Sequence, residues 1–186
     1  MHPDAIQPGD LFAPQDRPTL FVVPSHAVAD GPLMVLDSGF LFDARQALGP
    51  RFPLDAGLAV RTKNRNAVYG FQVLESPTFE SCGVALFQTR YSWWEEPARH
   101  LIQVSLEGLR DWMKANPSFR VRLGCPGIPY IPKREIADMI AGVVKTTKNL
   151  SIVSRAVPPS DAEFTAACTA GGSAKQFLTR KEGCHA

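Results

Sequence analysis

Hydrophobic residues occur along the chain in two patterns: short unbroken or alternating runs, and longer stretches with helical spacing. The short runs predict strands at 19–23, 68–74, 83–87, 119–123 and 150–153. Apolar residues three or four positions apart predict helices over 39–48, 97–115 and 132–143. Strands that alternate with helices at this short spacing predict an α/β fold, a three-layer sandwich.

The stretch after residue 97 has the clearest helical pattern. Leu101, Leu109 and Trp112 share one face with Ser105, and we expect the three apolar side chains to be buried against the sheet. Pro97 suits a first helical turn. A single core of this size fits one domain, which we place at 1–157. From residue 158 the apolar periodicity is lost, so 158–186 is expected to be a C-terminal tail or a short helical extension.

Composition excludes several classes of protein. A hydrophobic fraction of 45%, a charged fraction of 20% and a net charge of +2 are those of an ordinary globular protein, and they indicate neither a nucleic-acid nor a membrane partner. No apolar run is long enough to span a bilayer, and the first residues do not resemble a secretory signal, so we expect a cytoplasmic protein. The four cysteines are dispersed, and we predict no metal site and no cofactor.

Two strand-to-helix junctions carry the candidate chemistry. The first, at 87–98, contains Trp93 and Trp94, and the second, at 125–130, contains a Cys-Pro-Gly turn. In open α/β sheets, loops at the carboxyl ends of the strands converge on the ligand. Both junctions therefore predict a binding site. One tryptophan is expected in the core and the other over the start of the helix. His26, a lone histidine after a strand, is expected to be structural.

Four blocks in this order resemble the macro domain family, the ADP-ribose-binding α/β/α module, and most of all its bacterial and phage-type single-domain members. They are Gly-Asp-Leu-Phe at 9–12, Ser-Gly-Phe at 38–40 with Arg-Phe-Pro at 51–53, Phe-Gln-Thr-Arg at 87–90 with a following tryptophan, and Pro-Gly-Ile at 126–128 with the helix start at 133–136. The resemblance implies a mixed central sheet and binding of ADP-ribose or a related nucleotide. It also implies a set of ligand-binding residues: Asp10, Ser38, Gly39, Phe40, Gln88, Thr89, Arg90, Trp93, Gly127, Ile128 and Tyr130.

Each implied role has a simpler alternative. Asp10 matches the acid that accepts the adenine amino group, but an aspartate after Pro-Gly is also a common turn former. Gln88, Thr89 and Arg90 would line the ligand pocket, or they would satisfy local backbone groups. Tyr130 would cap a ribose or adenine, or it would fill the space left by missing glycines, and we favour the second interpretation.

The glycine loops depart from the family pattern. The first keeps one glycine over 34–39, and the second has Pro129, Tyr130 and Pro132 after Gly127-Ile128. Glycine loops bind phosphate through unhindered N–H groups, whereas proline has no such donor. We therefore expect a weakened pyrophosphate cradle. Arg90 stands where the family has lysine, and an arginine cannot give up its proton as a buried lysine can.

Three functions remain open from the sequence. The first is binding of ADP-ribose with little or no catalysis. The second is ADP-ribosyl hydrolysis, for which the only candidate groups are Asp37, Asp30 and Arg90. The third is a protein-interaction module, phage-encoded by its likeness to phage-type members, that has lost its nucleotide. An ADP-ribosylated protein or a host protein is the macromolecular partner that these functions imply.

Overall fold

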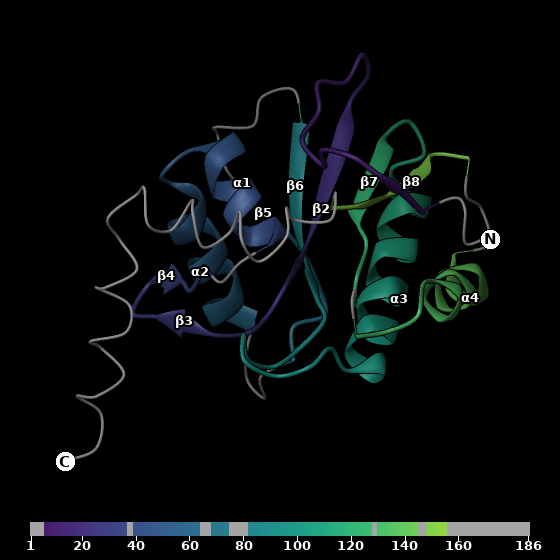
Figure 1. The fold of residues 1–186 in the computed structure, drawn as a ribbon. Helices are drawn as coiled ribbons and strands as arrows, with labels where there is room; N and C mark the ends of the chain where they lie inside the picture. Colours follow the sequence, from purple (N-terminus) through teal and green to yellow (C-terminus); the bar gives the residue numbers. More distant parts are fainter. Residues whose placement is uncertain are drawn as a thin grey trace, which may run out of the picture. The chain divides into compact units, whose positions relative to one another are not determined.

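The computed structural model describes residues 6–36, 39–63, 68–74, 82–127, 130–144 and 148–155 (Figure 1). All of them belong to one compact unit that ends at Arg155. The segment 158–186 lies outside the described residues, so its assignment as a tail stays a prediction. Within the described part of the chain, no helix is long and apolar enough to cross a membrane.

A six-stranded mixed sheet forms the centre of the fold, in the order β1-β8-β7-β2-β6-β5. Its neighbouring strands run parallel, except that β5 pairs antiparallel with β6. The strands are β1 (Ile6–Pro8), β2 (Thr19–Ser25), β5 (Phe71–Leu74), β6 (Cys82–Gln88), β7 (Arg120–Gly124) and β8 (Leu150–Ser154). A separate antiparallel hairpin joins β3 (Ala29–Asp30) to β4 (Leu33–Met34).

Helices cover both faces of the sheet, as Figure 1 shows. They are α1 (Phe40–Leu48) and α2 (Phe52–Lys63) on one face, and α3 (Arg99–Ala115) and α4 (Lys133–Val143) on the other. The alternation along β6 builds both cores: Val84 and Leu86 pack with α1 and α2, whereas Ala85 and Phe87 pack with α3 and α4. The predicted three-layer α/β/α sandwich with a mixed sheet is confirmed.

The helix α2 was missed by the sequence analysis. Its buried face has the small residues Ala56 and Gly57 between Phe52 and Val60, while Leu58 is exposed, so its apolar positions mark no clear stripe. Gly57 is required by a close approach: a Cβ there would lie 2.2 Å from the carbonyl oxygen of Pro32 in the β3–β4 turn. The hairpin and α2 therefore pack backbone against backbone, a contact that hydrophobic periodicity cannot reveal.

Two expectations for α3 need correction. The helix begins at Arg99, so Pro97 precedes it instead of occupying its first turn. Leu101 and Leu109 are fully buried, as predicted, but Trp112 is only partly buried, at the edge of the core against Phe119. On an ideal helix position 112 lies only about 20° from position 101, so Trp112 shares the face of Leu101. It is partly exposed because it lies near the end of α3, at the edge of the core.

Candidate functional site

The carboxyl ends of five parallel strands meet at one edge of the sheet, called here the carboxyl edge. The strand register places Pro8 beside Ser154, Val153 beside Gly124, and Ser25 beside Gln88. The loops that carry Asp10, Arg90 and Gly127 begin within three residues of these strand ends. The topology thus brings together segments that lie up to 117 positions apart in the chain, from Asp10 to Gly127.

The loop after β1 is tied down by a residue of the central sheet. Arg122 on β7 donates through Nε to the carbonyl of Leu11 at 3.0 Å and through Nη2 to that of Asp10 at 2.6 Å. The Asp10 side chain accepts the Phe12 N–H through Oδ1 at 2.8 Å, the geometry of a turn aspartate. A carboxylate has a second oxygen, and this residue is exposed. The turn role is confirmed, and the adenine role stays a prediction.

The start of α1 lies at the same edge. Gly39 is its N-cap residue and makes no side-chain cap hydrogen bond. The ring of Phe40 packs over Gly124 at the end of β7, where a Cβ would lie 3.0 Å from it. In the first turn, Asp43 accepts two hydrogen bonds from Arg155, at 2.8 and 3.0 Å.

Asp37, Ser38 and Asp30 are the remaining candidates that the sequence placed near the first glycine loop. Asp37 and Ser38 lie outside the described residues. Asp30 is exposed in β3, on the hairpin that packs against α2. The structure therefore gives no catalytic geometry to either carboxylate.

Gln88 and Thr89 support the local backbone. Gln88 is fully buried, and its Oε1 accepts the N–H groups of Tyr69 at 2.7 Å and of Gly70 at 3.1 Å. Thr89 donates to the Ser25 carbonyl through both its N–H, at 2.9 Å, and its hydroxyl, at 3.2 Å. The simpler of the two sequence interpretations accounts for these contacts, because each one joins β6 to its neighbours.

Arg90 also turns toward its own loop. Its Nη1 donates to the carbonyl of Trp93 at 2.9 Å and lies 3.5 Å from that of Glu95. Trp93 is 42% and Trp94 65% exposed, with their rings edge to face at 5.4 Å. The prediction that one of these tryptophans belongs to the core is wrong. Apolar side chains of α3 itself, such as Leu101 and Ile102, already fill the adjacent core.

His26 is the feature that the sequence analysis underestimated. The side chain is fully buried directly after β2, and its Nδ1 accepts the Val28 N–H at 3.1 Å, which leaves the proton on Nε2. Within the described residues, Nε2 has no hydrogen-bond partner. Burial, and then the nearby charge of Arg90, lower the pKa of His26 to about 4, with the Val35 backbone acting in the opposite direction. The histidine is therefore a neutral donor at pH 7. No sequence signal separates it from an ordinary structural histidine.

The loop after β7 closes on itself. Gly127 has a φ of 84°, and the Ile131 N–H donates to its carbonyl at 2.9 Å. Ile131 is 3% exposed and packs against Gly127, where a Cβ would lie 2.9 Å from its Cδ1. Tyr130 is 56% exposed. The residue that fills the loop is therefore Ile131, and the prediction that Tyr130 does so is wrong.

The carboxyl edge offers neither a reactive thiol nor a metal site among the described residues. Burial raises the pKa of the Cys125 thiol to about 12, so it is not a nucleophile at neutral pH. Among the described residues, no three histidine, cysteine, aspartate or glutamate side chains come together as a metal site requires. Ile128 and Pro129 lie outside the described residues.

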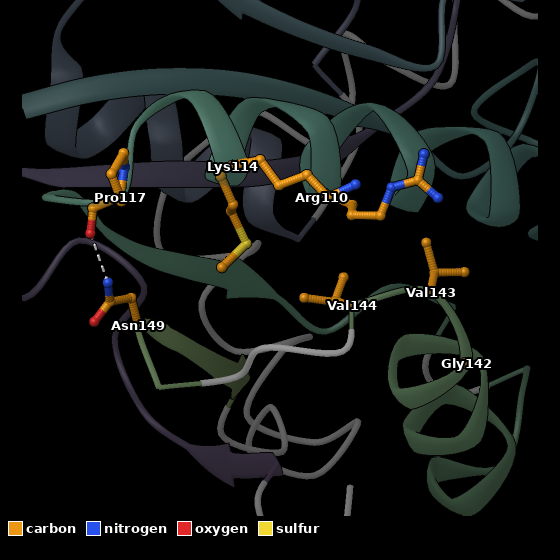
Figure 2. Close-up of a pocket in the computed structure, with 8 residues that line it drawn as sticks. Arg110, Lys114, Pro117, Gly142, Val143, Val144 and Asn149 are labelled. Carbon is orange, nitrogen blue, oxygen red and sulfur yellow. Dashed lines mark hydrogen bonds between the residues drawn. The ribbon is translucent and has the colours of Figure 1, made fainter.

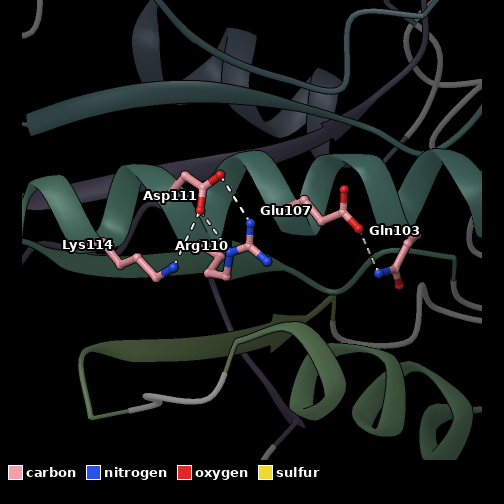
Figure 3. A network of polar contacts seen from close by, with 5 residues as sticks. All are labelled: Gln103, Glu107, Arg110, Asp111 and Lys114. Carbon is pink, nitrogen blue, oxygen red and sulfur yellow. Dashed lines mark hydrogen bonds and ion pairs between the residues drawn. The ribbon is translucent and has the colours of Figure 1, made fainter.

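Two cavities lie toward the other end of the sheet. One, of about 890 Å³, is lined by residues from 12–21 together with Val73, Gly83, Trp112 and Phe119. The other, of about 430 Å³, lies between the last turns of α3 and α4, and Figure 2 shows Val143 and Val144 across from Arg110 and Lys114. Asp111 binds both of these cations in an exposed network on α3 (Figure 3). The two cations are thus paired within the helix, and the carboxyl ends of α3 and α4 carry partial negative charge. This cavity is therefore poorly suited to phosphate.

Comparison with known proteins places the fold. No family model matches the sequence, and no curated protein matches it either. Solved structures do match: the macrodomain of Thermus aquaticus DarG has a TM-score of 0.62 and 13% identity over 81% of this chain and 96% of that one. The macrodomain of Mycobacterium tuberculosis DarG has a TM-score of 0.62 and 14% identity, over 83% and 97%. Thermosipho africanus DarTG, solved in complex with ADP-ribose, has a TM-score of 0.61 and 13% identity, over 81% and 41%. The chain has the macrodomain fold in a divergent sequence, which confirms the resemblance at the level of fold.

Proposed function

We propose that this protein binds ADP-ribose or a related nucleotide at the carboxyl edge, with little or no turnover. One observation carries the proposal: Arg122 holds the loop of Asp10 at the same edge as the start of α1 and the Gly127 loop. The macrodomain fold belongs to a family that binds ADP-ribose. Because the identities are low, the fold alone does not transfer that ligand to this chain.

The groups at the edge suit the two ends of such a ligand differently. Asp10 has a second carboxylate oxygen for an exocyclic amine, while its first oxygen keeps the Phe12 N–H. The start of α1 offers backbone N–H groups without a side-chain cap, and such groups favour anions. Ile131 occupies the space beside Gly127 that a phosphate-binding glycine loop leaves open. We therefore expect the adenine end to contribute more to affinity than the pyrophosphate.

Arg90 and His26 do not favour hydrolysis. The Arg90 guanidinium donates to carbonyls of its own loop, and a guanidinium offers donors and no acceptor. The only lone pair of neutral His26, on Nδ1, already accepts the Val28 N–H. A general base needs an available lone pair within reach of its proton. Neither Arg90 nor His26 can therefore act as the general base of a hydrolase, and Asp37, another candidate from the sequence, lies outside the described residues.

Calorimetry with ADP-ribose tests the proposal. Asp10→Asn keeps an acceptor oxygen for Phe12 but removes the charge, and Asp10→Ala should cost roughly 1.5–3 kcal/mol of binding free energy. Asp16→Ala is the matched control, because Asp16 is exposed and pairs with Arg120 at 3.0 Å. Replacement of Pro129 by glycine, which adds an N–H donor to the Gly127 loop, should strengthen binding.

Two results would replace this proposal with one of its alternatives. Release of ADP-ribose from a modified protein by the unaltered chain would establish a hydrolase. No heat of binding from either the unaltered chain or the glycine variant would instead favour a protein-interaction module.

A further inference from the structure

The tip of the loop between β6 and α3, residues 91–96, is held in place by hydrogen bonds within the loop. The Ala98 N–H donates to the Thr89 carbonyl at 2.7 Å, which draws the two ends of the loop together. Inside it, Arg90 donates to Trp93 at 2.9 Å, and the Glu95 N–H donates to the carbonyl of Ser92 at 3.2 Å. The tip is therefore ordered without any contribution from buried tryptophan side chains.

Neighbouring elements fix the same loop from outside. The Ala27 N–H donates to the Tyr91 carbonyl at 3.0 Å, which attaches the loop to the end of β2. The Tyr91 hydroxyl and the His100 Nε2 share a hydrogen bond of 2.7 Å, which attaches it to α3. An ordered loop loses little conformational entropy when a partner binds to it.

The tip presents two tryptophans that packing within the domain does not explain. Trp93 and Trp94 are 42% and 65% exposed, whereas the third tryptophan of the chain, Trp112, is partly buried against Phe119. Adjacent exposed tryptophans place large apolar area in water, and residues of this type supply most of the binding energy at protein interfaces. Their position on an ordered tip is that of an interaction surface.

Charge decides which partner the tip fits. Glu95 and Glu96 follow the tryptophans and are both exposed. The Arg90 guanidinium is turned to loop carbonyls, and Arg99 makes a bidentate ion pair with Glu135. Carboxylates beside indole rings repel phosphates. They attract arginine or lysine, whose cation can lie over an indole face while it pairs with a carboxylate.

We propose that the tip formed by Trp93, Trp94, Glu95 and Glu96 is a docking surface for a basic segment of a partner polypeptide. This inference goes beyond nucleotide binding and does not depend on it. Where both hold, the basic segment lies on a loop of the carboxyl edge, next to the strand ends that would hold the nucleotide.

Fluorescence anisotropy of labelled probes tests the proposal on the full chain. The probes are a short peptide of alternating glycine and arginine, its glutamate counterpart, and a single-stranded oligonucleotide of equal length. The arginine peptide should bind best, and added salt should weaken its binding. Trp94→Ala, and Glu95→Gln with Glu96→Gln, should each weaken it by about three- to tenfold, the range of cation–π and exposed charge contributions.

Matched controls separate this surface from general effects. Leu58→Ala removes another exposed apolar side chain, 46% exposed on α2, and Glu107→Gln removes an exposed carboxylate on α3; neither should change binding of the arginine peptide. Equal or tighter binding of the glutamate peptide or of the oligonucleotide would overturn the proposal, and so would unchanged binding by the tip variants. Calorimetry of the Glu95→Gln, Glu96→Gln variant with ADP-ribose reports on nucleotide binding separately, so the two proposals can fail independently.

Discussion

The loops that follow β6 and β7 leave the same edge of the sheet and end in helices on the same face, yet they are built in opposite ways. The β6–α3 loop is held by hydrogen bonds and turns its aromatic side chains outward to solvent. The β7–α4 loop is closed by one backbone hydrogen bond, from the Ile131 N–H to the Gly127 carbonyl, and by an apolar contact, with the Ile131 side chain turned inward onto Gly127. The difference shows that a strand-to-helix junction can be ordered with or without a buried apolar side chain, and that this choice decides which side chains remain available to a partner.

The largest expected effect concerns the apolar contact. Ile131→Ala should lower the free energy of unfolding by about 2–5 kcal/mol, as truncation of buried aliphatic side chains does. Chemical denaturation measures this loss. The neighbouring exposed Tyr130→Ala is the control and should change stability by less than about 0.5 kcal/mol. If the two variants were equally stable, the β7–α4 loop would not be closed by Ile131.

The polar contact between the end of β6 and the segment before β5 should contribute less to stability, but measurably. Gln88→Leu removes the acceptor shared by the N–H group of half-buried Tyr69 and that of buried Gly70. Each unpaired buried donor costs roughly 1–3 kcal/mol. Denaturation of this variant should show a loss of stability of at least the lower figure. A variant as stable as the unaltered chain would show that Gln88 does not hold the segment before β5 to the end of β6.

His26 makes the stability of this edge dependent on pH. Its pKa is lowered to about 4 in the folded chain from 6.5, so between these values the unfolded chain takes up a proton that the folded chain does not. The free energy of unfolding should therefore fall as the pH drops through this window, by up to about 1.4 kcal/mol per pH unit. His26→Asn should remove this part of the slope. Identical slopes for the two proteins would mean that His26 is not held neutral by burial.

The smallest effect is expected at the outward-facing tip. Trp94→Ala should change the free energy of unfolding by less than about 0.5 kcal/mol, because the side chain is 65% exposed. A thermal melt measures the difference. A loss comparable to that of Ile131→Ala would erase the contrast between the two loops and would make Trp94 a structural residue.

Much of this architecture could be predicted from the sequence, because buried strands and amphipathic helices leave a strong periodic pattern. The strands β2, β5, β6, β7 and β8 and the helices α1, α3 and α4 all lie where that pattern predicted them, within a few residues. The missed elements lack such a pattern: α2 has small residues in the middle of its buried face, and β1, β3 and β4 are only two or three residues long.

The location of the candidate site could be predicted from the sequence, but most of its side-chain contacts could not. Its loops follow from topology, since carboxyl ends of parallel strands must share an edge. Whether a loop side chain points inward or toward solvent depends on its tertiary packing, which hydrophobic periodicity does not reveal. For this reason Ile131 instead of Tyr130 fills the second loop and both tryptophans face solvent. The buried donor of His26, which has no partner among the described residues, had no sequence signal either.

Chemical-shift mapping with ADP-ribose tests the central claim most directly, because each amide reports its own position. We expect the largest shifts at Asp10, Leu11, Gly39 and Gly127 on the carboxyl edge. The amides of Met113 and Val144, beside the cavity between the last turns of α3 and α4, should stay unchanged. Shifts confined to that cavity, or no shifts at saturating nucleotide, would contradict the assignment of the carboxyl edge as the nucleotide site.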